Sequence, residues 1–351
     1  MMDRQGVVIG GVDCHLEFHV AVVLDEQGRK LGDGRFDADF AGYRELHDWL
    51  RSFGDVRAVG IESTGSYGAG LTRCLIAEGV RVIEVNQPHP HLQHRRGKTD
   101  TIDAEAAARK VLSGEATGLA KTRDGRIEAI RNLSVARRSA VKSRVAAVIQ
   151  LGQVIVTAPA EVRESISGRG LKAKARHCAK FDVDLSRIAA PAEAARFALS
   201  SIAKRIAMLD TEINLLDAQL APLVAQVAPS MIGLIGVGTQ HASQLLVSAG
   251  ENIDRFPNEG AFAHLCGVHP IPASSGKTNR HRLNRGGDRN ANRALHMIVV
   301  CRLRYCERTR AYMQRRLDEG RTKPEIIRCL KRYVAREIFH TLRADLAPQQ
   351  A

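Results

Sequence analysis

The sequence predicts an α/β domain with a mixed sheet, followed by a long helical region and a mainly helical C-terminal domain. Three observations carry this prediction. Residues 6–37 contain three strand-like runs, with a hairpin turn, DEQG, at residues 25–28. Residues 43–85 then alternate between helix-like and strand-like segments. From Thr99 to about Ala228 almost every segment has a helical pattern.

The first predicted domain, residues 1–125, holds the expected sheet. Its first strand, residues 7–12, ends at Asp13, and its fourth, residues 58–61, ends at Glu62. The second strand is expected at residues 18–24, the third directly after the turn at 25–28, and the fifth at 81–85. Helices are expected at 43–53 and 71–78. Three strands followed by alternating helix and strand indicate a mixed sheet.

The second predicted domain, residues 126–228, is helical. From Leu199 to Val227 apolar residues recur at alternating steps of three and four, which is a heptad seam. The seam is typical of a coiled-coil hairpin or a dimer contact, and a plain long core helix remains the alternative. Residues 126–150 form an expected partner helix, whose basic residues, Arg137 and Arg144 among them, offer phosphate contacts. Residues 165–180, with two glycines and many basic residues, are expected to form a mobile tip or a linker.

The third predicted domain, residues 229–351, begins with a glycine-containing turn. Residues 235–238 (IGVG) precede an expected helix at 239–248. Glycines allow tight turns, and the free amides at a helix N-terminus suit a phosphate. The segment resembles a helix-hairpin-helix element that clamps a DNA backbone, although an ordinary turn between helices fits the same residues.

The composition favours a nucleic-acid partner. The chain of 351 residues has 52 Lys and Arg against 38 Asp and Glu, a formal net charge of +14. We find no apolar run near the ~20 residues that a membrane span needs, and the N-terminal residues lack the layout of a signal peptide. The seven cysteines form no Cys-x-x-Cys pair, so neither a zinc ribbon nor a disulfide framework is indicated. We therefore expect a cytoplasmic protein, associated with the nucleoid when bound to DNA, with no membrane partner.

Four carboxylates are predicted to form a metal site. Asp13 and Glu62 end strands that would lie side by side if the first and fourth strands are neighbours, whereas Asp100 and Asp103 open a helix and share one of its faces. Converging carboxylates repel one another unless cations neutralise them, and oxygen ligands select Mg²⁺, with Mn²⁺ as the alternative. Two such ions can stabilise both oxygens of a phosphodiester exchange.

The motifs around these carboxylates resemble those of a known family. Residues 11–15 (GVDCH), 60–65 (GIESTG) and 98–104 (KTDTIDA) are similar to the RuvC-like domain of the DEDD insertion-sequence transposases, the insertion-sequence one-ten family. The resemblance covers nearly the whole chain. It implies an RNase H-like fold, with catalytic and metal-binding roles for Asp13, Glu62, Asp100 and Asp103.

A serine loop extends the resemblance to the C-terminal domain. Residues 272–276 (PASSG) precede a basic stretch, and the residues alone favour a flexible Ser-Gly turn. Residues 265–276 and 285–290 are similar to the C-terminal domain of the same family, in which the serine before the glycine is the nucleophile. That residue is Ser275 here, with Ser274 as the alternative because the serine is doubled. The segment 269–272 (HPIP) departs from the usual apolar-Pro pattern, which leaves the loop geometry open.

The resemblance implies that the protein cuts and rejoins the DNA of a mobile element. Its expected partners are element ends and target DNA, a structured guide RNA from the element, and other copies of the chain in a dimer or tetramer. The expected nucleic-acid contacts are Arg95, Arg96, Lys98, Lys277, Arg280, Arg282, Arg285 and Arg289.

Three alternatives remain open at this point. A junction-resolving endonuclease would keep the fold and use activated water instead of serine. A catalytically silent nucleic-acid-binding protein would need none of the carboxylates. Residues 10–13 (GGVD) also resemble the first phosphate loop of actin-like sugar kinases, but a second such loop is missing, and Asp100 and Asp103 would have no role there.

Overall fold

The computed structural model describes residues 6–85, 99–168, 170–276 and 281–347. The chain divides into two compact units, one formed by Met1–Glu128 with Leu245–Ala351 and the other by Ala129–Gln244. The three-domain organisation with boundaries after residues 125 and 228 stays a prediction.

The first unit contains a five-stranded mixed sheet, as the sequence predicts. The order is β3-β2-β1-β4-β5, where β1–β2 and β2–β3 are antiparallel and β1–β4 and β4–β5 are parallel. The strands are β1 (Val7–Cys14), β2 (Phe18–Asp25), β3 (Lys30–Asp37), β4 (Asp55–Ile61) and β5 (Val82–Glu84). Because β1 and β4 are neighbours with Val12 opposite Ile61, their carboxyl ends lie at the same edge of the sheet.

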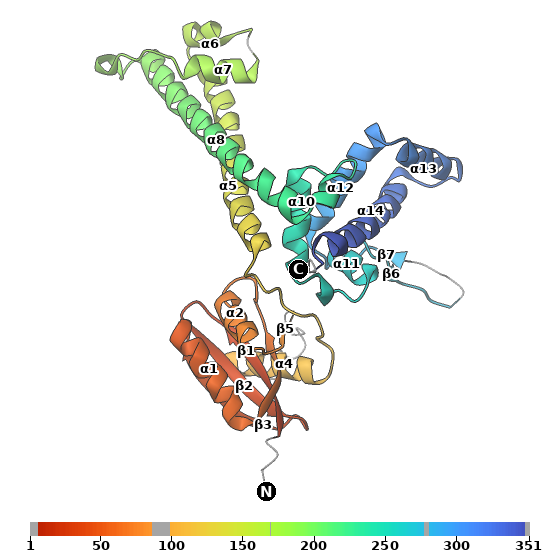
Figure 1. The fold of residues 1–351 in the computed structure, drawn as a ribbon. Coiled ribbons are helices and arrows are strands. Elements are labelled where there is room, and N and C mark those ends of the chain that lie inside the picture. Colours follow the sequence, from red (N-terminus) through yellow and green to blue (C-terminus); the bar gives the residue numbers. More distant parts are fainter. Residues whose placement is uncertain (1–5, 86–98, 169, 277–280, 348–351) are drawn as a thin grey trace. The chain divides into compact units, whose positions relative to one another are not determined.

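Helices cover both faces of this sheet (Figure 1). On one face, α1 (Phe40–Phe53) and α2 (Ala69–Ala77) contribute fully buried leucines, such as Leu50 and Leu71, to the core. On the other face, α4 (Asp100–Leu112) packs its alanines against Ile9 and Val22. The small side chains of α4 let its backbone approach the sheet closely.

Glycines in β1 and β4 make this close approach possible. A Cβ atom added to Gly11 would lie 2.1 Å from the carbonyl oxygen of Ala104, and one added to Gly60 would lie 2.8 Å from that of Ala107. Real Cβ atoms do not come so close to backbone atoms, so only glycine permits this packing. The two glycines therefore set how near the N-terminus of α4 lies to the end of β1.

The second unit is a helical hairpin of α5 (Arg126–Thr157) and α8 (Pro191–Val227), with α6 (Ala160–Ile166) and α7 (Leu171–Cys178) at its far end (Figure 1). Apolar residues of all four helices share one core. Arg137 forms a bidentate ion pair with Asp217, at 2.5 and 3.0 Å, and Arg144 forms another with Asp210. These two arginines are therefore engaged within the hairpin, and the phosphate contacts predicted for them are wrong for this conformation.

Two further expectations about the hairpin need correction. The sequence predicts a mobile tip or linker for the glycine-containing stretch 165–180, yet half of it, Leu171–Cys178, is the helix α7. The sequence shows no long apolar run, but α5 is long and apolar enough, by length and composition alone, to cross a membrane. A single helix of this kind is weak evidence for a membrane span, and α5 packs against α8 through the shared core.

The C-terminal segment is mainly helical, as predicted. Its helices are α9 (Pro229–Ile232), α10 (Thr239–Ala249), α11 (Glu259–Leu265), α12 (Arg289–Tyr305), α13 (Glu307–Asp318) and α14 (Lys323–Asp345). It also contains a short hairpin of β6 (Ile271–Pro272) and β7 (His281–Arg282). The 3-10 turns are η1 (Leu185–Arg187), in the second unit, and η2 (Ile253–Arg255). Phe262 of α11 and Phe339 of α14 are fully buried and in ring contact, which ties these helices together.

Hydrogen bonds join the two sequence segments of the first unit. Lys121 Nζ donates to the carbonyl of Val247 at 2.6 Å, and Arg255 Nη1 donates to that of Leu119 at 2.9 Å. The amide of Glu128 donates to Glu251 Oε1 at 2.9 Å. The residues before position 129 and those after position 244 thus belong to one folded unit.

Candidate active site

The ends of two parallel strands place the first two carboxylates. Asp13 lies near the end of β1, and Glu62 directly follows β4, where its amide donates to the carbonyl of Val12 at 3.4 Å. Ser63 then adopts a left-handed backbone conformation, with φ of 57°, and turns the chain away from the sheet. The condition set by the sequence, that the first and fourth strands are neighbours, therefore holds in the structure.

The N-terminus of α4 supplies the other two carboxylates. Thr99 caps the helix, since its side chain accepts a hydrogen bond from the amide of Ile102 at 3.3 Å. Asp100 and Asp103 occupy the first turn and share one helical face. Asp103 is buried, with 6% exposure, whereas the side chain of Asp100 is 45% exposed. The capped turn thus carries one buried and one partly exposed carboxylate.

A histidine lies among these carboxylates. His15 Nε2 is 3.3 Å from Asp13 Oδ2 and 3.4 Å from Asp100 Oδ2. Ligand atoms of Asp13, His15 and Asp100 all lie within 4.8 Å of one another. The ring also packs on Phe18, with centroids 4.7 Å apart, which limits its orientation.

The acidic groups act electrostatically on one another and on Cys14. Burial raises the pKa of Asp13, His15 opposes that shift, and the negative charges of Asp103 and Asp100 add to it. Burial, together with Asp13 and Glu62, raises the pKa of the Cys14 thiol, which stays protonated. Negative charge is thus concentrated at this edge of the sheet. A set of carboxylate oxygens with one imidazole nitrogen fits a divalent cation, which would relieve that repulsion.

The sequence prediction missed His15 as part of the site. Side chains two apart in an extended chain point to the same face, and His15 directly follows β1, two residues after Asp13, so this spacing is a signal that could have been used. The catalytic and metal-binding roles of Asp13, Glu62, Asp100 and Asp103 stay predictions. Of these four residues, the structure places ligand atoms of Asp13 and Asp100 within 4.8 Å of each other.

Ser274 and Ser275 lie on an exposed segment directly after β6, distinct from the carboxylate sheet. The base of this segment is tightly fixed. Gly267 has φ of 64°, and a Cβ atom added to Gly287 would lie 2.3 Å from the amide nitrogen of Gly267. Asn292 Nδ2 donates to the carbonyls of Cys266 and Gly267 at 2.9 and 3.0 Å. The serines therefore extend from a rigid base.

The predicted nucleic-acid contacts fall into two groups. Arg282 on β7, Arg285 in the following loop and Arg289 at the start of α12 are exposed. The others, Arg95, Arg96, Lys98, Lys277 and Arg280, lie outside the described residues.

Comparisons with known families match both parts of this architecture. One family model, described as a transposase, matches residues 10–158, which include all four carboxylates. A second, described as the transposase IS116/IS110/IS902 family, matches residues 232–314, which include the serine segment. Both matches describe transposases, enzymes that act on DNA during transposition.

Two relatives agree with this class. The chain is 23% identical over 375 residues to an uncharacterized 42 kDa protein of insertion element IS900 from Mycobacterium paratuberculosis, an alignment that covers 93% of each chain. It is also 28% identical over 116 residues to an uncharacterized 43.6 kDa protein of insertion element IS110 from Streptomyces coelicolor, covering 33% of this chain and 28% of that relative. The chain belongs to the IS110 family of transposases.

Proposed function

We propose that the protein cuts and rejoins DNA strands of a mobile element at the carboxylate cluster, on an RNase H-like domain. The observation that carries this proposal is the convergence of Asp13, Glu62 and the α4 aspartates from three elements onto one sheet edge. A structural role alone gives no reason to concentrate negative charge at one place.

The proposed metal is Mg²⁺, with Mn²⁺ as the alternative, held by Asp13, Glu62, Asp100 and Asp103. Divalent ions bound there would polarise the scissile phosphate and stabilise charge on its attacking and leaving oxygens. The carboxylates at the start of α4 would help to position that phosphate. Burial of Asp103 fixes one carboxylate, and the greater exposure of Asp100 leaves an approach for the substrate.

Ser275 is the proposed nucleophile, with Ser274 as the alternative. Its Oγ would form a bond to phosphorus while the bond from phosphorus to the leaving strand oxygen breaks, and the serine proton would be transferred to that oxygen. A second strand hydroxyl then attacks the phosphoserine, and the serine recovers a proton. One phosphodiester is exchanged for another, so no ATP is needed.

Partners and assembly complete the proposal. We propose that a structured RNA from the element guides the choice of DNA, that the helix-hairpin-helix-like segment around residues 235–238 contacts a nucleic-acid backbone, and that the chain forms a dimer or tetramer in the cytoplasm. Exposed apolar side chains on the helical hairpin support assembly through a coiled-coil contact: Val145, Ile149, Met208 and Leu215 are each more than half exposed.

Ser275→Ala is expected to abolish the covalent protein-DNA adduct, because it removes the hydroxyl that forms the bond to phosphorus. Ser274→Ala is the matched control, since it removes the neighbouring hydroxyl, and it should retain the adduct. The adduct can be trapped on a labelled DNA substrate with Mg²⁺ and measured on a denaturing gel. Strand cleavage by a variant lacking both hydroxyls would instead identify an endonuclease that uses water.

His15→Ala is expected to weaken Mn²⁺ binding by about tenfold while changing Mg²⁺ binding less, because imidazole nitrogen suits Mn²⁺ better than Mg²⁺. Isothermal titration with each ion measures the effect independently of DNA cleavage. His296→Ala, on an exposed face of α12, is the control. Equal losses for both ions would show that His15 only orients the carboxylates.

A further inference from the structure

A cleft of about 610 Å³ lies within the C-terminal segment, away from the carboxylate sheet in sequence. One wall is the chain around the β6–β7 hairpin, residues 267–270 and 281–284, and the other is formed by the end of α13, the turn after it and α14. The hairpin in this wall is the one whose first strand leads into Ser274 and Ser275.

The cleft is strongly basic. Among the described residues that line it, Glu325 is the one acidic side chain, and the cationic ones are Arg282, Arg316, Arg321, Arg328, Lys331 and Arg332. Glu325 is already engaged, since its Oε2 accepts hydrogen bonds from the amide and the hydroxyl of Thr322 at 3.0 and 2.7 Å, in the capping box of α14. Among the described residues, Arg282, Arg321 and Arg328 form no ion pair with a carboxylate. The hydrogen bonds from Thr322, together with Arg321 and Arg328, lower the pKa of Glu325, so its one negative charge lies near two cations, and positive charge remains in excess in the cleft.

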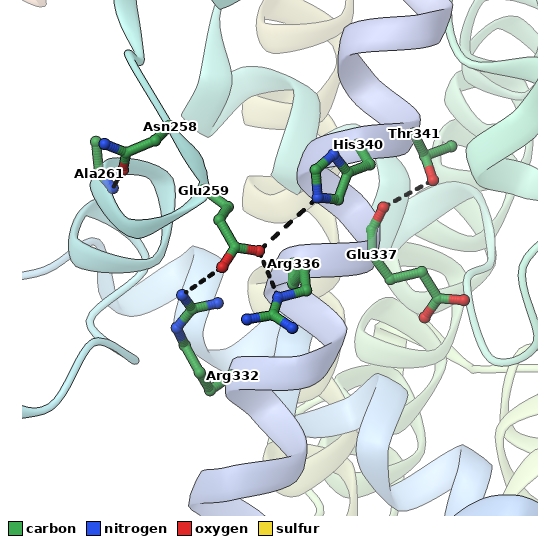
Figure 2. A network of polar contacts seen from close by, with 8 residues as sticks. All are labelled: Asn258, Glu259, Ala261, Arg332, Arg336, Glu337, His340 and Thr341. Atoms are coloured by element: carbon green, nitrogen blue, oxygen red, sulfur yellow. Dashed lines mark hydrogen bonds and ion pairs between the residues drawn. The ribbon is translucent and has the colours of Figure 1, made fainter.

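Glu259 of α11 holds one of these arginines in place (Figure 2). Its Oε1 accepts from Arg332 Nη2 at 3.0 Å, while its Oε2 accepts from Arg336 Nε at 2.5 Å and lies 3.8 Å from His340. Arg332 Nη1 is left buried with no hydrogen-bond acceptor among the described residues. A buried, unsatisfied guanidinium donor is unfavourable unless an anion reaches it.

The wall opposite α14 offers a second unsatisfied atom. His269 Nδ1 is also buried without a hydrogen-bond partner among the described residues. The backbone beside it is fixed, because Lys331 Nζ donates to Asn292 Oδ1 at 2.8 Å and Asn292 in turn holds the carbonyls of Cys266 and Gly267. Burial and the nearby charge of Arg328 lower the pKa of Lys331, as expected for cations crowded without an anion.

We propose that this cleft binds a phosphate of a nucleic-acid backbone. Glu259 orients Arg332 toward that phosphate, and Arg321 and Arg328 neutralise the adjacent phosphates. Planar guanidinium groups match phosphate oxygens in pairs, and several spread over two helices suit a repeating polyanion better than a single carboxylate. The half-exposed ring of Tyr333 adds a flat apolar surface in the same cleft. The inference rests on the proposed function, because such a phosphate would be held beside the serine segment.

The test compares two double variants of the full chain. Arg321→Glu with Arg328→Glu reverses charge inside the cleft, and Arg308→Glu with Arg310→Glu makes the same charge change on the exposed face of α13 outside it. Binding of a DNA duplex and of an RNA of the same sequence is measured by fluorescence anisotropy over a range of salt concentrations, without divalent ions. We expect the cleft variant to bind at least about tenfold more weakly, with a salt slope smaller by about 1 for each lost phosphate contact.

The outcomes separate the possibilities. A loss confined to DNA or to RNA identifies the strand that the cleft holds. Equal behaviour of the two double variants would overturn the proposal, as would competition by polyglutamate as strong as that by nucleic acid. Because no divalent ion is present, failure here leaves the proposed catalysis untouched, whereas failure of the catalytic proposal would appear as cleavage that survives changes to the carboxylates.

Glu259→Gln tests the orienting contact separately. The substitution raises the net charge by one, so charge alone predicts tighter nucleic-acid binding. Loss of the oriented Arg332 predicts binding weaker by roughly threefold, with the melting temperature followed to detect unfolding. Binding as tight as that of the unchanged protein would refute the orienting role of Glu259.

Discussion

Asp13→Asn is expected to reduce strand cleavage by at least about a hundredfold, because it removes the carboxylate that both the α4 aspartates and His15 surround. An amide of nearly the same shape keeps the packing of β1 but carries no charge for a cation. Mn²⁺ binding, measured by electron paramagnetic resonance, should be lost in parallel. DNA binding without metal should stay nearly unchanged.

Asp37→Asn is the matched control for this prediction. Asp37 ends β3 of the same sheet and is exposed, so its loss makes the same charge change away from the site. Cleavage and Mn²⁺ binding should both be retained. A large loss of DNA binding in Asp13→Asn, with normal metal binding, would contradict the role of Asp13 as a ligand.

Gly11→Ala is expected to destabilise the first unit by about 3 kcal/mol, because the new methyl group would press on the backbone of α4 rather than on a movable side chain. The helix must move away from β1, carrying Asp100 and Asp103 with it. Thermal unfolding measures the loss of stability, and titration with Mn²⁺ measures the accompanying loss of metal affinity.

Gly118→Ala provides the comparison, since a Cβ at this position meets no atom within 4 Å. Its effect on stability should stay within about 0.5 kcal/mol. If Gly11→Ala were as mild as this control, the close approach of α4 to the sheet would not be what positions the acidic residues.

The strands and the acidic residues could be predicted because their signals are local. Residues 7–12 and 58–61 are short apolar runs, each followed by a carboxylate, and parallel neighbouring strands end at the same edge of a sheet. Asp100 and Asp103 are three residues apart at a helix start, which fixes their common face whatever the tertiary structure.

The basic cleft could not be predicted in this way. Arg321, Arg328 and Arg332 belong to one stretch of sequence, but His269 and Arg282 come from a distant hairpin, and Glu259 comes from a third element. Arg137 and Arg144 also show that contacts between residues distant in sequence cannot be predicted locally. They look like free cations in the sequence, and only the pairing of α5 with α8 brings Asp217 and Asp210 to them.

The hydrogen bonds between residues 119–128 and 247–255 have a consequence for biosynthesis. The intervening 116 residues, 129–244, must leave the ribosome before these bonds can form, which takes roughly 6 to 23 s at ordinary rates of translation. A nascent polypeptide interrupted in that interval would contain every acidic residue of the cluster but no serine hairpin. Only chains translated almost to their end could complete the unit that carries both.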